Sequence, residues 1–176
     1  MAKKFELTAE FVTNVFGKKL FRIKALMTFG DVKEGELGGY MEKEENLDHD
    51  GDAWVSGDAR VSGDAWVYGN AQVYGNARVS GNAQVYGNAQ VSGDAWVSGD
   101  AWVYGDARVS GDARVYGDAW VYGDARVSGD AWVYGNAWVS GDARVSGDAR
   151  VSGDADYATI KGFGSESRAT TFFRLK

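Results

Sequence analysis

Most of this chain is a six-residue unit that repeats without insertion or deletion. From Gly51 to Ser152 there are 17 consecutive hexads, which begin GDAWVS GDARVS GDAWVY, and a partial unit at 153–156 ends the array. Within a hexad Gly, Ala and Val never vary, the second position is Asp or Asn, the fourth is Trp, Arg or Gln, and the sixth is Ser or Tyr. Units this short bury an apolar face only by stacking on their neighbours, so the repeat predicts a solenoid.

The order of residues within the hexad indicates how the chain coils. Ala and Val lie two residues apart, so on an extended strand both side chains point to one face, while position four points to the other. Gly followed by Asp or Asn is typical of a turn, because Gly adopts positive φ freely and an Asx side chain can bond its own backbone. Three such strands per turn give a triangular prism whose coils stack about 4.8 Å apart. We therefore predict an all-β parallel solenoid of about six coils, with Val and Ala inside and positions four and six facing solvent.

The hexads resemble those of the hexapeptide-repeat proteins, in which an aliphatic residue is followed four residues later by a small one, here Val and Ala. The resemblance implies a single-stranded left-handed parallel β-helix; a right-handed β-helix, usually built from longer and less uniform coils, is the alternative. Segments outside the array (20–26, 29–32, 38–40, 44–47 and the C-terminal GFGSESRATTFFRLK) are similar to bacterial and prophage hexapeptide-repeat proteins described as transferases from the repeats alone. Proteins of that group typically continue past the position of Lys176. This difference and the uniformity of the hexads suggest an idealised or trimmed sequence, or recent duplication of repeats in a phage gene.

The ends of such a solenoid need caps, because a bare terminal coil exposes apolar side chains and unpaired backbone groups. We divide the chain into an N-terminal β cap at 1–50, the solenoid at 51–156 and a C-terminal cap at 157–176. A strand is expected at 170–175 in the last of these.

Within the N-terminal cap, Lys19–Leu26 is expected to form a strand paired with Phe5–Thr8, with a turn at 17–18. Gly35–Tyr40 is expected to be a loop. The aromatic residues expected to cover the first coil are Phe5, Phe11, Phe16, Phe21 and Phe29.

Hexads three apart share a face of the prism, so the outward positions can be sorted by face. One face carries aromatic residues at eight of its ten outward positions and none of the arginines of the array. The other two faces carry two and four aromatic residues among twelve positions each. We call the eight residues the aromatic face: Trp66, Tyr68, Tyr86, Trp102, Tyr104, Trp120, Tyr122 and Trp138.

Two interpretations of the aromatic face stay open at this stage. Contiguous exposed apolar patches mark binding surfaces, so the face is a candidate for self-association or for a protein partner. Alternatively, aromatic side chains on neighbouring strands stabilise a sheet by about 0.2–1 kcal/mol per pair without any partner. A flat Trp/Tyr surface could also stack on the sugar rings of a glycan.

The amino-acid composition limits which catalytic and metal-binding sites the chain can form. The chain has no Cys and one His, which excludes thiolate chemistry and three-histidine metal sites. Columns of Asp at the predicted corners could bind calcium, but Asn occupies the same position in five hexads, so we expect a structural turn there and no metal or cofactor. His49, between Asp48 and Asp50, is expected to be a solvated loop residue rather than a catalytic base.

We expect a non-enzymatic structural or interaction protein, either a scaffold or a phage-derived component. A degenerate acyltransferase-like enzyme using His49 and a carbohydrate-binding solenoid are the alternatives. The net charge of −6 argues against a nucleic-acid partner. No apolar run is long enough for a membrane span, and 1–5 leads into no signal-peptide core, so we expect a cytoplasmic protein without a membrane partner.

Overall fold

The computed structural model describes residues 3–153 and the backbone of 156–158. The predicted C-terminal cap lies outside the described residues except for its first two positions, and the strand expected at 170–175 lies wholly outside them.

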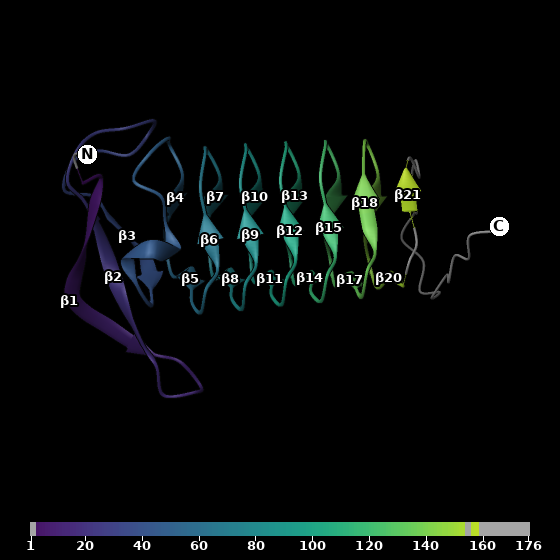
Figure 1. The fold of residues 1–176 in the computed structure, drawn as a ribbon, viewed down its shortest axis with the longest axis horizontal. Coiled ribbons are helices and arrows are strands. Elements are labelled where there is room, and N and C mark those ends of the chain that lie inside the picture. Colours follow the sequence, from purple (N-terminus) through teal and green to yellow (C-terminus); the bar gives the residue numbers. More distant parts are fainter. Residues whose placement is uncertain (1–2, 154–155, 159–176) are drawn as a thin grey trace.

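The repeat array forms an all-β parallel solenoid of about six turns, as predicted (Figure 1). Each strand pairs in parallel with the strand three hexads away, so that Trp102 lies opposite Trp120 and Val103 opposite Val121. This register confirms three strands per turn, although each strand is mostly two residues long, because Ala lies just outside it.

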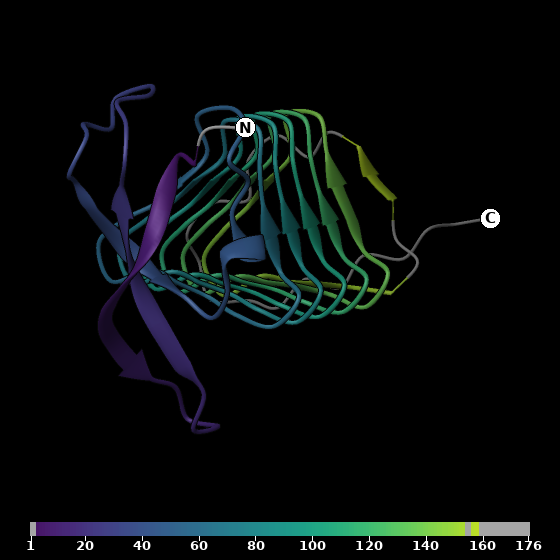
Figure 2. The same ribbon diagram turned by 60° about the vertical axis from the view of Figure 1, so that its left-hand side comes forward.

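The strands fall into three sheets, one for each side of the prism, and Figure 2 shows them in an oblique view. The first sheet contains β4 (Trp54–Val55), β7 (Gln72–Val73), β10 (Gln90–Val91), β13 (Arg108–Val109), β16 (Arg126–Val127) and β19 (Arg144–Val145). The solenoid part of the second sheet contains β5 (Arg60–Val61), β8 (Arg78–Val79), β11 (Trp96–Val97), β14 (Arg114–Val115), β17 (Trp132–Tyr134) and β20 (Arg150–Ser152). The third sheet contains β6 (Trp66–Val67), β9 (Gln84–Val85), β12 (Trp102–Val103), β15 (Trp120–Val121), β18 (Trp138–Ser140) and β21 (Asp156–Ala158).

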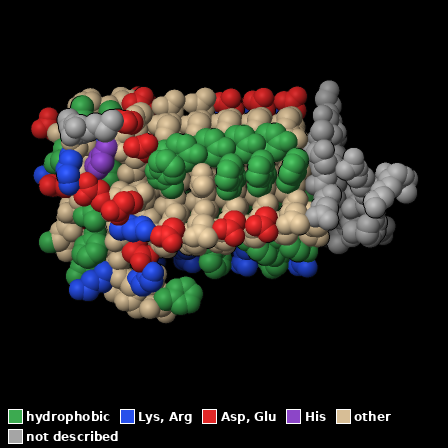
Figure 3. Space-filling model, in the orientation of Figure 1, with side chains coloured by type: hydrophobic (Ala, Val, Ile, Leu, Met, Phe, Trp, Pro, Cys, Tyr) green, Lys and Arg blue, Asp and Glu red, His purple; other side chains and the backbone are tan. Residues whose placement is uncertain are grey.

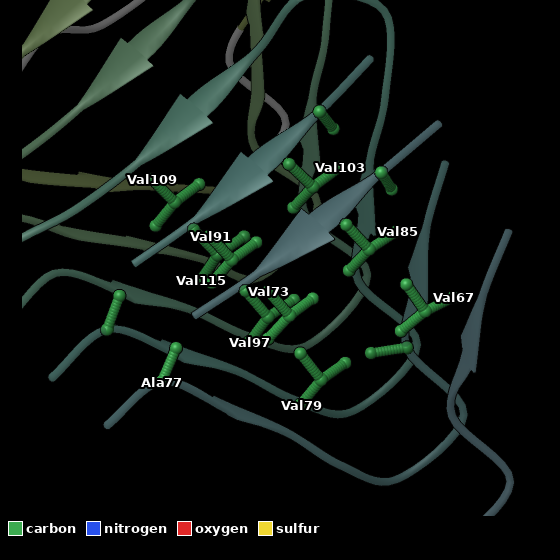
Figure 4. Close-up of a cluster of buried hydrophobic side chains, with 14 of the residues drawn as sticks. Val67, Val73, Ala77, Val79, Val85, Val91, Val97, Val103, Val109 and Val115 are labelled. Atoms are coloured by element: carbon green, nitrogen blue, oxygen red, sulfur yellow. The ribbon is translucent and has the colours of Figure 1, made fainter. Parts of the chain in front are cut away.

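The interior is filled by valine and alanine, and Figure 4 shows the valines of neighbouring coils pointing toward one another. Every Val from Val55 to Val139 is completely buried, as predicted. Burial of one such side chain contributes roughly 1.5–3 kcal/mol, so the core gains stability coil by coil.

Glycine at each corner is required by backbone conformation and by close approach. The φ angles of the corner glycines from Gly51 to Gly153 lie between 60° and 84°, the left-handed region that L side chains avoid. The next coil is also too near for a side chain: a Cβ on Gly99 would lie 2.9 Å from the amide nitrogen of Gly117. The corner therefore sets both the bend and the stacking distance.

Three of the Asn side chains that follow corner glycines act differently from the prediction. The side-chain amides of Asn70, Asn82 and Asn88 do not bond the backbone of their own turn. Instead, the Asn82 side-chain amide donates to Asp100 Oδ1 at 2.8 Å in the next coil, and the Asn70 and Asn88 amides donate in the same way to Asn88 and Asp106. The turns are closed by backbone bonds, such as Ala59 N–H to the Ser56 carbonyl. The equal spacing of the corners favours these bonds between coils.

Backbone hydrogen bonds give the solenoid a direction. The N–H groups of hexad positions two, four and six donate to carbonyls of the next coil toward the C-terminus, as in Arg60 N–H to Ala77 O and Trp102 N–H to Ala119 O. The carbonyls at the matching positions of the first coil have no preceding coil to bond, so they face the N-terminal cap. An effective cap on this end has to supply donors.

The cap supplies a different donor to each side of the first coil. On the second sheet, Tyr40 N–H and Glu42 N–H donate to the Ala59 and Val61 carbonyls. On the third, the buried amide of Asn46 donates to the carbonyls of Gly63 and Ala65 at 3.0 and 2.8 Å. On the first, the Lys4 ammonium donates to the carbonyls of Gly51 and Ala53 at 3.2 and 3.0 Å.

An antiparallel hairpin is joined directly to this parallel solenoid. β1 (Phe5–Thr13) pairs with β2 (Lys19–Ala25), which confirms the predicted strand pair and turn, with a longer first strand than expected. β3 (Leu37–Met41) pairs antiparallel with β2 and parallel with β5, and the 3₁₀ helix η1 (Glu44–Asn46) follows.

The prediction of a loop at 35–40 was therefore wrong for 37–40, which belong to β3. Gly38 and Gly39 are strand residues that let β3 lie against the first coil. A Cβ on Gly38 would meet Ile23 Cγ1 at 2.4 Å, and one on Gly39 would meet the Ala59 carbonyl oxygen at 2.6 Å. These glycines allow close packing within a strand.

Two predictions about aromatic residues near the cap also need correction. Phe5 is fully buried and Phe29 packs on the core, but Phe11 and Phe16 are 44% and 84% exposed and do not cover the first coil. Trp54, expected to face solvent, is only 2% exposed, because Phe29 makes an edge contact with its ring at a centroid distance of 5.4 Å.

The double role of the corner glycine gives a first prediction. We expect Gly99→Ala to lower the free energy of unfolding more than Gly17→Ala, since both require positive φ, at about 1–2 kcal/mol, but only Gly99 also faces the backbone of the next coil. Gly17 lies in the exposed hairpin turn, where an added Cβ meets no described atom within 4 Å. Urea unfolding measures both, and equal losses would contradict the close-approach argument.

Lys4 gives a second prediction. Its burial lowers the pKa of the ammonium group from 10.5 to about 8, and Asp48, Asp52 and Asp50 only partly oppose this. Because the unfolded chain keeps the proton to higher pH, the free energy of unfolding should rise between about pH 8 and 10.5, by no more than about 3 kcal/mol. Denaturant unfolding across this range measures the slope, and a Lys4→Met variant with the same slope would show that another group is responsible.

Candidate interaction surface

The aromatic face lies on the third sheet, as the sorting of hexads predicted, and Figure 3 shows it as a continuous green band along the solenoid. Trp66 and Trp138, at its two ends, are 41% and 42% exposed, and the other six side chains are half-buried. The eight predicted residues therefore form one contiguous surface.

Tyrosines at position six form a stacked column along this sheet. The ring centroids of Tyr68 and Tyr86 lie 4.7 Å apart, those of Tyr86 and Tyr104 lie 4.8 Å apart, and those of Tyr104 and Tyr122 lie 5.0 Å apart. The interplanar angles are 6° or less. This spacing is close to the interstrand distance, so the backbone register imposes the stacking.

Tryptophans at position four form a second column beside the first. The rings of Trp102 and Trp120 are separated by 4.9 Å at 2°, and those of Trp120 and Trp138 by 5.3 Å at 13°. Edge contacts tie the two columns together, as between Tyr104 and Trp120 at 6.4 Å and 73°. The stacking that the sequence left as one interpretation is thus present, and it holds the rings in a fixed array.

Carboxylates border the aromatic face at both corners, and red side chains flank the green band in Figure 3. The corner before the third-sheet strands carries Asp64, Asp100 and Asp118, and the corner after them carries Asp106, Asp124 and Asp142. All six are exposed. The surface is therefore apolar in its centre and negative at its borders.

The second sheet holds a smaller aromatic group that sorting by face did not single out. Trp132 lies between two guanidinium groups, with the Cζ atoms of Arg114 and Arg150 at 5.0 and 4.8 Å from its ring centroid. The ring of Tyr116 stacks on Tyr134 at 5.2 Å and meets Trp132 edge-on. The alternation of Trp and Arg at position four of this sheet is the sequence pattern from which these contacts could have been predicted.

His49 was expected in solvent but is half-buried. Its ring stacks on Phe5 at 4.4 Å, Nδ1 accepts the Lys4 N–H at 3.1 Å, and Nε2 lies 2.8 Å from Glu44 Oε1. Accepting at Nδ1 leaves the ring proton on Nε2, which donates to Glu44. With both nitrogens engaged, His49 joins the start of the cap at Lys4 and Phe5 to Glu44 of η1.

An open groove between the cap and the aromatic face also escaped the sequence analysis. Its lining combines charged residues from the cap with Trp66 from the aromatic face: Lys43, Glu44, Glu45, Leu47, Asp48, His49, Asp64 and Trp66. Its lining residues form ion pairs: Lys43 with Asp64 at 2.5 Å, and Glu44 with Lys3 at 2.8 Å. Lys3 and His49 lower the pKa of Glu44.

Among the described residues no group of three or more His, Cys, Asp or Glu side chains is arranged to hold a metal ion. No helix in that part of the chain is long and apolar enough to cross a membrane.

The repeats match a known family of β-solenoid proteins. The family model of the YdcK Beta solenoid repeat matches residues 53–69, 71–87, 83–99, 89–105, 107–123, 121–135, 125–141 and 143–155, which together make up more than half of the chain. No curated protein matches the chain.

The tyrosine column gives a third prediction. Burial raises the pKa of Tyr68, Tyr86 and Tyr104 above the ordinary 10.0, and neighbouring tyrosines add to the shift of the last two. An unfolded chain should therefore ionise first as the pH rises through 10, so the free energy of unfolding should fall above that pH. Tyrosinate absorbance should rise at higher pH in the native protein than in denaturant. Superimposed titration curves would contradict this, and Tyr86→Ser, which interrupts the column, should bring the two curves closer.

Proposed function

This chain belongs to the YdcK β-solenoid repeat family, and from that premise we propose that it is a non-enzymatic structural protein that associates with copies of itself or with another protein through its aromatic face. Within this proposal the coils wind in the left-handed sense of the hexapeptide-repeat proteins.

One observation supports the proposal most strongly. Four tyrosines and four tryptophans lie on a single side of a water-facing solenoid, and none of the array's arginines lies among them. Aromatic side chains are enriched at the centres of protein interfaces, where they contribute a large share of the binding energy. The stacked columns are already ordered, so binding has little side-chain entropy to remove.

A glycan is the second candidate, and the exposed rings at the ends of the tryptophan column favour it. Trp66 and Trp138 are each more than two-fifths exposed. The inner rings suit a sugar less well, because their faces already stack on neighbouring rings. A glycan array with Trp66→Gln and Trp138→Gln variants distinguishes this function, since protein association depends on the middle of the face.

The proposal predicts that Trp102→Gln/Trp120→Gln weakens self-association about tenfold or more, as the loss of central interface tryptophans does. Glutamine suits the fold, because Gln84 occupies the same column between Trp66 and Trp102. Sedimentation velocity over a range of concentrations gives the association constant.

The matched control is Trp96→Gln/Trp132→Gln, which removes two tryptophans from the second sheet and should leave association unchanged. Sedimentation profiles of the wild type and of Trp102→Gln/Trp120→Gln that coincide at every concentration would rule out self-association through this face.

A further inference from the structure

A column of arginines on the first sheet has no partner within the described part of the chain. Arg108, Arg126 and Arg144 occupy position four of three successive strands in register, and all three are exposed. None of their side chains makes a hydrogen bond, ion pair or ring contact with another described residue. Like charges directly opposite one another on neighbouring strands destabilise a sheet. The column is therefore poised to bind negative charge from outside the molecule.

The arginine column runs beside the coils that carry the tryptophan column. In the chain, Arg108, Arg126 and Arg144 each follow a tryptophan of the third sheet by one hexad: Trp102, Trp120 and Trp138. Nearer the cap the first sheet has Gln72 and Gln90 instead. The residue at position two of the neighbouring corner changes with them, from Asn70 and Asn88 to the carboxylates Asp106, Asp124 and Asp142.

We propose that the aromatic face of one molecule binds the arginine column of a second copy lying alongside it in the same axial direction. This rests on the proposed function and identifies its partner. Both columns repeat at the strand spacing, so three arginines face three tryptophans without a shift along the axis. With the ends of the two copies level, the opposite axial direction would place Gln90 and Gln72 opposite Trp120 and Trp138.

The chemistry of the two surfaces matches. The methylene stems of the arginines cover the half-buried rings, while the guanidinium groups reach the carboxylates at the borders of the aromatic face. The chain shows within itself that the two side-chain types pack at this spacing, since Arg114 and Arg150 enclose Trp132 on the second sheet.

Pairing of two aromatic faces is less favourable electrostatically. It would bring the acidic borders of both copies together without a cation from the array, because no arginine of the array lies on the third sheet. The second sheet is a weaker partner, since Trp132 separates Arg114 from Arg150 and already contacts both. A contact between different faces also leaves each copy with a free surface, so it generates rings or filaments.

The test mixes two variants that are each damaged on one surface. Arg108→Gln/Arg126→Gln removes the arginine column, and glutamine is the residue already at that position in β7 and β10. Trp102→Gln/Trp120→Gln removes the centre of the aromatic face. Each variant alone should associate at least about tenfold more weakly than the wild type. An equimolar mixture should form a one-to-one dimer, because one intact aromatic face meets one intact arginine column.

The charge-matched control is Arg60→Gln/Arg78→Gln, which removes two arginines in register on the second sheet and should associate like the wild type. Association of the wild type should weaken as salt is added, since carboxylates at the borders take part. Circular dichroism of each variant establishes that the fold is kept.

The outcomes separate this inference from the proposed function. If only the tryptophan variant fails to associate and the mixture forms no dimer, the aromatic face is an interface but its partner is not the arginine column. If the second-sheet arginine control fails as well, general charge is responsible and the inference is wrong. A wild type that stays monomeric at all concentrations overturns both the inference and self-association.

Discussion

Stacking of identical corners at the interstrand distance is the constraint on which the rest of this structure depends. A glycine in the left-handed region turns the chain, and its missing Cβ lets the backbone of the next coil approach. Once the corners coincide, each residue lies directly over the residue 18 positions away. The columns of valine, tyrosine, tryptophan and arginine then follow from the register.

The same stacking sets what the first coil requires of its cap. The N–H groups of hexad positions two, four and six donate toward the C-terminus, so the first coil presents the carbonyls of its Gly, Ala and Val residues to the cap. A lysine, an asparagine and the backbone of β3 serve as donors, one for each side of the prism. These groups share no sequence pattern, because what the coil requires is a donor at each side, and an ammonium, an amide or a strand N–H can supply it. The cap is irregular in sequence for that reason.

The hexad alone predicted the number of strands per turn, the buried positions and the membership of the aromatic face, because in a regular solenoid these depend only on counting residues. Residues outside the period were predicted less well. The sequence of Gly38 and Gly39 is typical of a loop, whereas their real role depends on the distance to Ile23 and Ala59 across the cap. Contacts with Phe29 and Phe5, distant in the chain, bury Trp54 and half-bury His49, and no local sequence pattern indicates either contact. The role of Asn70, Asn82 and Asn88 at position two was predicted wrongly for a related reason. Each side-chain amide bonds a side chain 18 residues away instead of its own turn.

The two interpretations of the aromatic face are compatible, because stacking within the molecule favours binding outside it. A lone exposed tryptophan loses rotamer freedom when a partner immobilises it, whereas Trp120 already lies between Trp102 and Trp138. Stacking also sets the distance between successive rings to the spacing of the backbone strands. Any surface built on the same repeat therefore has side chains at the same spacing along the axis. A second copy of this chain is one such surface. The regularity that makes the solenoid fold thus also makes its sides complementary in spacing, and the distribution of arginine and aspartate then decides which sides meet.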